Sequence, residues 1–132
     1  MRAWRRLQRM RIVIALALTD QSVIAGIGNV YRAELLFRHR RDPFRPAHEL
    51  DQTTWLAMWA DISALMRTAV KTGVIVTTRR EHRERRGGRV RPEDAHYVYR
   101  RQGLPCRVCG TEIRMTELAG RRLYWCPFCQ IE

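Results

Sequence analysis

The stretch DQSVIAGIGNVYRAELLF, residues 20–37, joins two apolar segments through Gly26, Gly28 and Asn29. Two glycines so close together destabilise a helix by roughly 1 kcal/mol each relative to alanine. We therefore expect the chain to turn here, or its backbone to lie close to another molecule. Because asparagine is a favourable helix N-cap, Asn29 is predicted to start a new helix that runs to Arg38. The two glycines are predicted to separate two helices.

The segments on either side also have helical patterns. Residues 1–18 have a basic start and a denser apolar end, which predicts a basic helix. Pro43 and Pro46 end the next helical pattern and predict a loop. From Asp51 to Gly73 the apolar spacing predicts the clearest helix of the chain. The core-facing stripe of this helix is predicted to contain Trp55, Trp59, Ile62, Leu65, Met66, Ala69 and Val70.

The chain is strongly basic, with Lys+Arg 25 against Asp+Glu 13 and a formal net charge of +12. Such a charge attracts polyanions, so nucleic acid is the expected partner. Lys71 is the only lysine, and the planar guanidinium of arginine suits phosphates and base edges. A GC-rich coding bias also explains the arginine excess, but it does not explain the net charge. Residues 79–91 contain seven arginines and predict an exposed loop that either contacts the polyanion or is a solvated linker.

Neither a membrane span nor a secretory signal is expected. The longest apolar run, residues 12–18, has seven residues, far fewer than the ~20 that cross a bilayer. No small-residue cleavage site follows it. All four cysteines fall in two C-x-x-C pairs, which favour a metal in a reducing compartment over disulfides. We therefore expect a cytoplasmic protein.

The four cysteines have the spacing of a metal site. Cys106, Cys109, Cys126 and Cys129 form the pattern C-x2-C-x16-C-x2-C, which is typical of a four-cysteine zinc site. Four thiolates complete a tetrahedral shell and leave no position for a catalytic water, so one structural zinc is predicted. Two alternatives use the same cysteines, a rubredoxin-like iron site and a pair of disulfides.

Between the two cysteine pairs, the sequence predicts two short strands around a turn at Ala119 and Gly120. Arg121 and Arg122 then lie at or beside the hairpin tip, where an arginine can reach into a groove, unless both are ordinary surface residues. Residues 95–103 predict a short strand that leads into the first cysteine pair. The predicted fold is therefore mainly α with a small β zinc-finger hairpin. Residues 1–95 are expected to form the helical module and residues 96–132 the finger.

Three motifs in this order, DQSVIAGIGNVYRAELLF, VYRRQGLPCRVCG and RRLYWCPFCQ, resemble the C-terminal half of the formamidopyrimidine-DNA glycosylase and endonuclease VIII family. The resemblance covers nearly the whole chain, and the ending YWCPFCQ looks closer to the endonuclease VIII branch. It implies a helix-two-turn-helix module followed by a zinc finger. It also implies a role in base-excision repair, in which family enzymes remove oxidised bases from DNA and cleave the abasic site.

The resemblance also implies which residues contact DNA. Asn29 is expected to donate to a phosphate while the adjacent glycine turns bring backbone amides to the same strand. Arg121 is expected to contact phosphates around the flipped-out nucleotide, with Arg122 as the alternative. The expected partner is damaged or abasic double-stranded DNA, bound by a monomer. The full set of residues expected at the DNA is Gly28, Ile27, Asn29, Tyr31, Arg121 and Arg122.

The family's catalytic groups are not found in this sequence. By the resemblance, an N-terminal proline attacks the sugar and a following glutamate moves protons, whereas Met1 is followed here by Arg2 and Ala3. No catalytic residue is therefore predicted, and activity is expected to need a separate N-terminal β-domain. Glu34 is expected to accept hydrogen bonds within the module. The histidines are expected to be surface or hydrogen-bonding residues: His39, His48, His82 and His96.

Two other classes of function stay open. One is a stand-alone module that binds damaged or distorted DNA without cutting it. The other is a zinc-ribbon adaptor for RNA or protein, which the cysteines favour but the glycine and asparagine turn does not.

Overall fold

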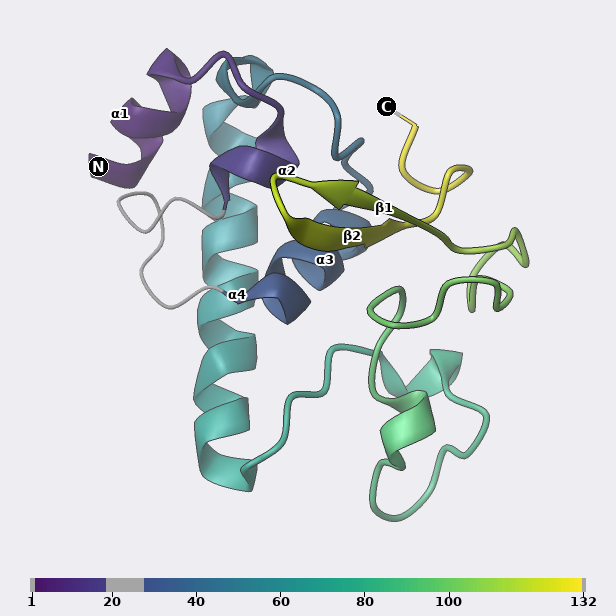
Figure 1. The fold of residues 1–132 in the computed structure, drawn as a ribbon. Coiled ribbons are helices and arrows are strands. Elements are labelled where there is room, and N and C mark those ends of the chain that lie inside the picture. The colour runs from purple at the N-terminus through teal and green to yellow at the C-terminus, as the bar shows by residue number, and fades with distance from the viewer. Residues whose placement is uncertain (1, 19–27, 132) are drawn as a thin grey trace.

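The computed structural model describes residues 2–18 and 28–131. The predicted turn residues Gly26 and Ile27 lie outside these ranges. The helices are α1 (Arg2–Arg9), α2 (Ile14–Ala17), α3 (Asn29–Arg38) and α4 (Gln52–Thr72), and the strands are β1 (Arg114–Leu118) and β2 (Arg121–Trp125). Short 3-10 turns lie at η1 (Ala47–Glu49), η2 (Arg80–His82) and η3 (Pro92–Asp94). The described residues form a mainly α fold with one small hairpin, as predicted, and Figure 1 shows α3 between the long helix α4 and the hairpin.

The predicted helix over residues 1–18 is broken, so that prediction is wrong in its middle. Helix α1 ends at Arg9 and α2 begins only at Ile14. Between them the backbone bonds to the proline loop instead. The Ile14 N–H donates to the Arg45 carbonyl at 2.6 Å, and the His48 N–H donates to the Met10 carbonyl at 2.9 Å. Backbone groups that pair with another segment cannot continue a helical ladder, so the helix is interrupted.

Helix α4 has the limits that the sequence predicts. The side chain of its N-cap Asp51 accepts a hydrogen bond from the Thr54 N–H at 3.1 Å. At the other end Gly73 has φ 80°, a left-handed conformation that glycine adopts without a steric penalty. The predicted apolar stripe is only partly correct. Met58 is buried in place of Trp59, and Val70 is 86% exposed, because the last turns of α4 extend beyond the core (Figure 1).

Helix α3 lies between two apolar cores. On one side Leu35 and Leu36 pack with residues of α1, α2 and α4. On the other side Ala33 and Phe37 pack with Tyr97 and with three of the four cysteines. All residues from Tyr31 to Phe37 are consequently buried. The helix therefore fixes the position of the finger relative to the other helices.

Glu34 anchors the segment that the sequence predicted to be a strand. Its carboxylate is fully buried and accepts hydrogen bonds from the N–H groups of Tyr97, Val98 and Tyr99 at 2.7, 2.8 and 2.9 Å. The Thr77 hydroxyl also donates to it. The predicted strand over residues 95–103 is wrong, because these N–H groups pair with a carboxylate and not with another strand. The predicted hydrogen-bonding role of Glu34 is confirmed.

A second polar contact joins α3 to α4. The guanidinium of Arg38 donates twice to the carboxylate of Asp61, each time at 2.8 Å, and His39 Nε2 lies 2.9 Å from the same carboxylate. Partial burial alone would raise the pKa of Asp61. The hydrogen bonds from His39 and Arg38 outweigh it and hold this pKa well below its usual range. Asp61 is therefore ionised at neutral pH and links the two helices.

The hairpin turn has the predicted sequence and a matching geometry. Ala119 has φ 50° and Gly120 has φ 79°, the two positive values of a type I′ turn. The strands pair antiparallel, with Leu118 opposite Arg121. Both arginines beside the tip, Arg121 and Arg122, are exposed, so the predicted hairpin is confirmed.

The basic segment 79–91 is mostly exposed, as predicted. Its start is held by side chains. The guanidinium of Arg83 donates to the Thr78 carbonyl at 2.7 Å, and the Tyr97 hydroxyl accepts from the Arg79 N–H at 3.0 Å. Whether this loop contacts a polyanion stays a prediction. Among the described residues, no helix has the length and apolar character needed to cross a bilayer.

Candidate nucleic-acid interface

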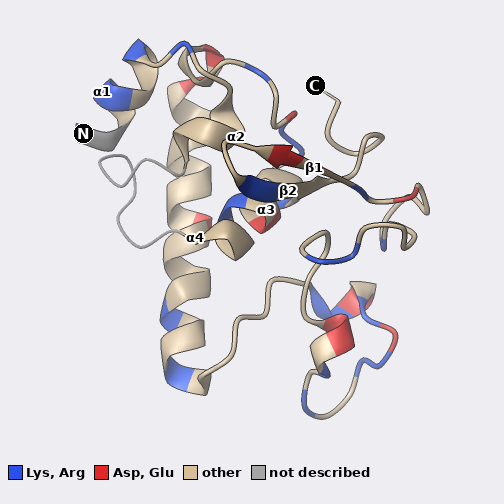
Figure 2. Cartoon of the chain, viewed as in Figure 1, with Lys and Arg blue, Asp and Glu red and all other residues tan. Residues whose placement is uncertain are grey.

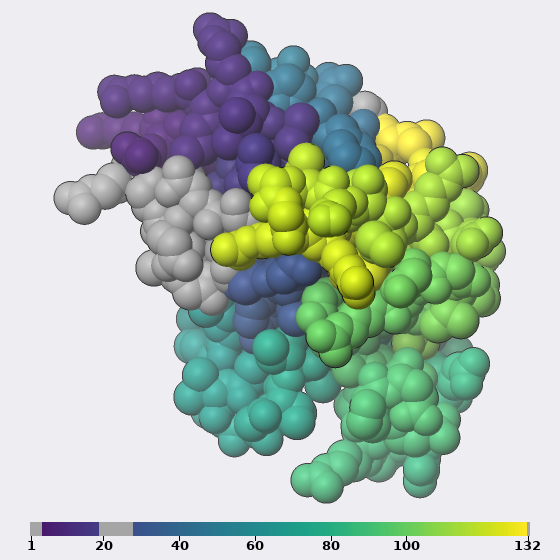
Figure 3. Space-filling view, viewed as in Figure 1, coloured from purple at the N-terminus to yellow at the C-terminus, as the bar shows by residue number. Residues whose placement is uncertain are grey.

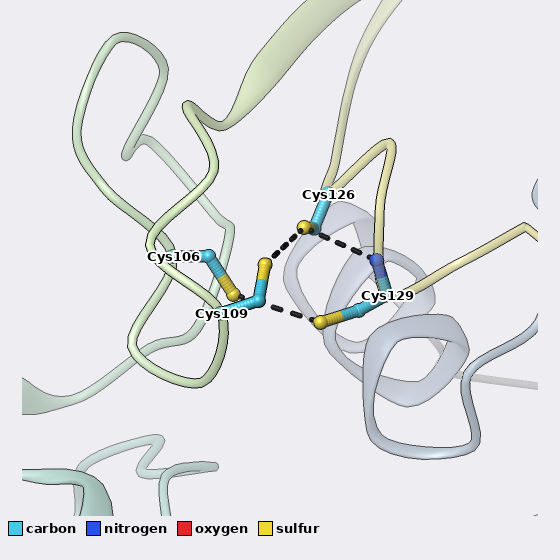
Figure 4. Close-up of side chains that lie close together, drawn as sticks. All are labelled: Cys106, Cys109, Cys126 and Cys129. Atoms are coloured by element: carbon cyan, nitrogen blue, oxygen red, sulfur yellow. Dashed lines mark hydrogen bonds between the residues drawn. The ribbon is translucent and has the colours of Figure 1, made fainter.

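The four cysteines converge on one point. Their sulfur atoms all lie within 4.8 Å of one another. Cys106 Sγ is 3.9 Å from Cys129 Sγ, and Cys109 Sγ is 3.4 Å from Cys126 Sγ (Figure 4). Four thiolates on a zinc ion at ~2.3 Å are about 3.8 Å apart, whereas a disulfide needs about 2.05 Å. The arrangement therefore fits a metal, and the disulfide alternative is wrong.

Backbone donors and burial act on the sulfur atoms in opposite directions. Backbone N–H groups of Val108 and Cys129 donate to Cys106 Sγ and Cys126 Sγ, each at 3.4 Å, as donors to thiolates do. Burial raises the pKa of Cys126, and burial together with the neighbouring sulfur atoms raises the pKa of Cys129. A bound divalent cation reverses this effect and holds the thiolates deprotonated.

Gln130 ties the second cysteine pair to the helices. It is 2% exposed, and its Oε1 accepts from the Cys126 N–H at 2.9 Å. Its Nε2 donates to the Arg41 carbonyl, just past α3, at 3.1 Å. No local sequence pattern indicates this role of Gln130, because its partners are identifiable only from the folded structure.

Helix α3 begins one residue earlier than predicted. Gly28 is the N-cap and Asn29 is the first helical residue, and no side chain caps the helix. The Arg32 N–H donates to the Gly28 carbonyl at 3.1 Å. It is the first N–H group of the helix that has an acceptor among the described residues. A Cβ atom added to Gly28 would meet no atom within 4 Å. N–H groups at a helix start that have no acceptor among the described residues can bind an anion.

The start of α3 is bonded to the finger. Asn29 Nδ2 donates to the Arg122 carbonyl at 2.7 Å. Arg32, whose role no local sequence pattern indicates either, donates to the same carbonyl at 3.3 Å. The yellow-green hairpin lies over the dark blue α3 in Figure 3, and basic residues lie on both segments in Figure 2. The helix start and the base of the finger tip thus lie side by side, and the exposed basic residues beside them are Arg121 and Arg122.

The predicted site residues do not all lie on this surface. Gly28, Asn29, Arg121 and Arg122 are described there, whereas Ile27 lies outside the described residues. Tyr31 is only 8% exposed and packs in the main core. Its contact with DNA stays a prediction, as do the other DNA contacts.

Comparison with known proteins places the chain in a family. Residues 1–81, more than half of the sequence, match the formamidopyrimidine-DNA glycosylase H2TH domain. The chain belongs to this family. Residues 103–131 of the same chain match the zinc finger found in Fpg and isoleucyl-tRNA synthetase (IleRS). This match and the four clustered cysteines identify the metal as one structural zinc, as predicted.

The curated relatives that the chain matches are about twice its length. The chain is 47% identical over 128 residues to Endonuclease 8 1 from Mycobacterium tuberculosis, and the match covers 97% of this chain and 48% of the relative. It is 36% identical over 115 residues to the formamidopyrimidine-DNA glycosylase of Thermus thermophilus, covering 87% of this chain and 43% of the relative. Of these two relatives, the endonuclease 8 has the higher identity to the chain, which confirms the predicted similarity to the endonuclease VIII branch. The chain spans about half of their length.

Solved structures have the same fold. The MutM (Fpg) protein of Thermus thermophilus superposes with a TM-score of 0.77 at 34% identity, over 97% of this chain and 48% of that one. The Fpg of Lactococcus lactis in complex with DNA containing an abasic site superposes with a TM-score of 0.77 at 26% identity, over 98% and 47%.

Proposed function

We propose that this chain is the DNA-binding half of an endonuclease VIII-like DNA glycosylase and abasic-site lyase. The observation that carries the proposal is the hydrogen bond between Asn29, at the open start of α3, and the Arg122 carbonyl beside the finger tip. This bond places a helix N-terminus and two exposed arginines on one surface. The similarity to an Fpg structure bound to abasic-site DNA supports double-stranded DNA as the ligand.

The physical chemistry of the surface suits the DNA backbone. Unpaired N–H groups at a helix start carry partial positive charge and bind phosphate. Arg121 and Arg122 add full charges beside them, and the chain has a net charge of +12. Contacts of this kind position a protein on DNA without reading its sequence. We therefore expect affinity for abasic or damaged duplexes that varies little with the flanking sequence.

The proposal includes the domain division, the monomeric state and the location of the chain. Residues 1–95 form the helical module and residues 96–132 the finger, and one monomer binds one duplex. A cytoplasmic location is supported by the zinc thiolates, which persist in a reducing compartment. In the intact enzyme, oxidised bases are the proposed substrates, and the half of the relatives that this chain does not span supplies the chemistry.

Binding of the purified chain to a duplex with an abasic-site analogue is expected to weaken steeply with salt. Replacing Arg121 with alanine should weaken binding and lower the slope of log affinity against log salt by ~1, because one phosphate contact is lost. Replacing Asn29 with alanine should weaken binding with almost no change of slope, because the side chain is neutral. Fluorescence anisotropy titrations between roughly 50 and 200 mM salt measure both effects.

Arg114 provides a matched control, since it is also exposed but lies at the far end of β1 from the turn. Arg114→Ala should change affinity much less than Arg121→Ala. An RNA hairpin tested in parallel separates DNA binding from the adaptor function. Affinity that is indifferent to salt, or equal for the RNA hairpin and the duplex, contradicts the proposal.

The purified chain is expected to form no borohydride-trapped complex with DNA that contains an abasic site. Trapping requires an amine that condenses with the sugar C1′ aldehyde, losing water, and an imine that borohydride then reduces to a stable amine. The only lysine, Lys71, lies in the last turn of α4, which Figure 1 shows well away from the hairpin. Gel analysis after borohydride treatment measures the cross-link.

A separately expressed N-terminal half from an endonuclease VIII-like relative provides the positive arm of this experiment. Restoration of trapping when it is added supports a role as half of an enzyme. Efficient trapping by the chain alone shows that this chain holds its own nucleophile, and peptide mapping then identifies it. Binding without trapping in either arm favours the stand-alone module that binds damaged DNA.

A further inference from the structure

Arg32 is a fully buried arginine that lies beneath the proposed DNA surface, bonded to Asn29 and to the Arg122 carbonyl. Its side chain has no exposed area, although arginine is almost never fully buried unless it is paired. Nη1 donates to the Ala15 carbonyl of α2 at 3.0 Å. Nη2 donates to Asn29 Oδ1 at 2.5 Å and to the Arg122 carbonyl at 3.3 Å. One guanidinium therefore joins α2, the start of α3 and the finger.

These contacts determine which way the Asn29 side-chain amide faces. A guanidinium can only donate, so the Asn29 atom that faces Arg32 must be the oxygen Oδ1. A carbonyl can only accept, so the atom that faces Arg122 must be the nitrogen Nδ2. An amide nitrogen has two N–H bonds, and the described residues accept only one of them. The second N–H of Asn29 is left to donate to a ligand at the surface.

The charge of Arg32 has no carboxylate partner among the described residues, whose ion pairs all involve other side chains. Arg38 on the same helix, by contrast, is paired with Asp61. Burial, together with the charge of Arg121, lowers the pKa of Arg32 to about 10, so the side chain is still charged at neutral pH. This charge polarises the Asn29 amide that it bonds, so its effect on an anion is passed through Asn29.

We propose that Arg32 is a positioning residue that holds the Asn29 amide ready to donate to a phosphate oxygen of DNA. The inference rests on the proposed function, because it assigns the ligand of Asn29 as a DNA phosphate. Arg32 itself contacts no DNA. It acts by fixing Asn29 Oδ1 and the Arg122 carbonyl, so the amide does not have to reorganise when the phosphate arrives.

The side-chain amide protons of Asn29, observed by NMR in the full chain, test the positioning directly. In the free wild-type chain one of the two protons should be protected from exchange with water, because it is bonded to the Arg122 carbonyl. Adding a duplex with a tetrahydrofuran abasic-site analogue should shift and protect the other. Arg32→Lys should remove this asymmetry, because an ammonium on a shorter stem cannot bond three oxygens in the geometry of a guanidinium.

A double-mutant cycle tests the coupling to DNA binding. Asn29→Ala and Arg32→Met should each weaken binding of the tetrahydrofuran duplex by about tenfold, the loss expected for a hydrogen bond to a charged group. If Arg32 acts through Asn29, the double variant should also lose about tenfold, and not the about hundredfold of two independent effects. Arg38→Met is the matched control, since it removes the other largely buried arginine of α3. It should lower thermal stability and leave both Asn29 protons and the affinity unchanged.

Additive losses in the cycle, or an Asn29 amide that keeps its asymmetry in Arg32→Lys, overturn the inference. If Arg32→Met does not fold, Arg32→Lys takes its place in the cycle, and the wild-type spectra still report on the amide. If the wild-type chain binds no DNA, the proposed function fails. The spectra of the free chain then decide separately whether Arg32 fixes the amide.

Discussion

Replacement of Cys126 with serine is expected to abolish zinc binding and to unfold the finger. The four sulfur atoms lie within 4.8 Å of one another and are the only cluster of metal-binding side chains found among the described residues. A finger of this size has too little apolar surface to fold alone, and zinc binding contributes on the order of 10–16 kcal/mol in small finger peptides. Elemental analysis should fall from one zinc per chain to near zero, and the finger should become sensitive to protease.

The helices should keep most of their structure in this variant. The main core is built almost entirely from helical and loop residues, and the finger contributes only Leu123 to its fully buried part. The far-ultraviolet helical signal is therefore expected to change little. Phe128→Ser is the matched control, because this side chain lies between two cysteines but is 63% exposed. The control should keep its zinc. Full zinc occupancy in Cys126→Ser, or iron as the main metal of the wild type, contradicts the assignment.

Replacement of Glu34 with alanine is expected to destabilise the chain by roughly 3–5 kcal/mol. Three backbone N–H groups lose their acceptor inside the protein, and the Thr77 hydroxyl keeps only the Ala95 carbonyl at 3.2 Å. Each buried donor without a partner costs about 1–3 kcal/mol, and the cavity that alanine leaves adds to this. Urea unfolding, followed by the helical signal, measures the change in the free energy of unfolding.

Glu117→Ala is the control for this measurement, since Glu117 is an exposed glutamate on β1. Its removal should change the free energy of unfolding by less than about 0.5 kcal/mol. Glu34→Gln is expected to fall between the two, because a glutamine keeps one acceptor but turns two donors toward backbone N–H groups. Equal stabilities of the wild type and Glu34→Ala would show that the carboxylate does not anchor residues 97–99.

The features that could be predicted from the sequence depend on residues only a few positions apart in the chain. The C-x-x-C pairs and the turn at Ala119 and Gly120 are local patterns, and the structure has both. Glu34 and Arg32 were harder to interpret, because their partners lie far along the chain. Glu34 bonds to Tyr97, and Arg32 bonds to Arg122. Nothing in the sequence near Arg32 shows that its charge is buried.

The wrong predictions share this cause. The apolar pattern of residues 1–18 suits a helix, but hydrogen bonds to residues 43–48 interrupt it. The β-branched and aromatic residues 97–99 suit a strand, but a carboxylate takes the place of a partner strand. Val70 lies on an apolar stripe, and only the length of α4 relative to the core leaves it exposed. In each case tertiary contacts override a local preference.

The central claim is that the start of α3 and the finger tip form one DNA-binding surface. The most direct test is an NMR titration of the labelled chain with a duplex that contains a tetrahydrofuran abasic-site analogue. Because Asn29 is bonded to Arg122, the backbone amide resonances of residues 28–31 and 119–122 are predicted to shift together, with one dissociation constant. Shifts confined to the basic loop 79–91, or different dissociation constants for the two segments, would contradict the account.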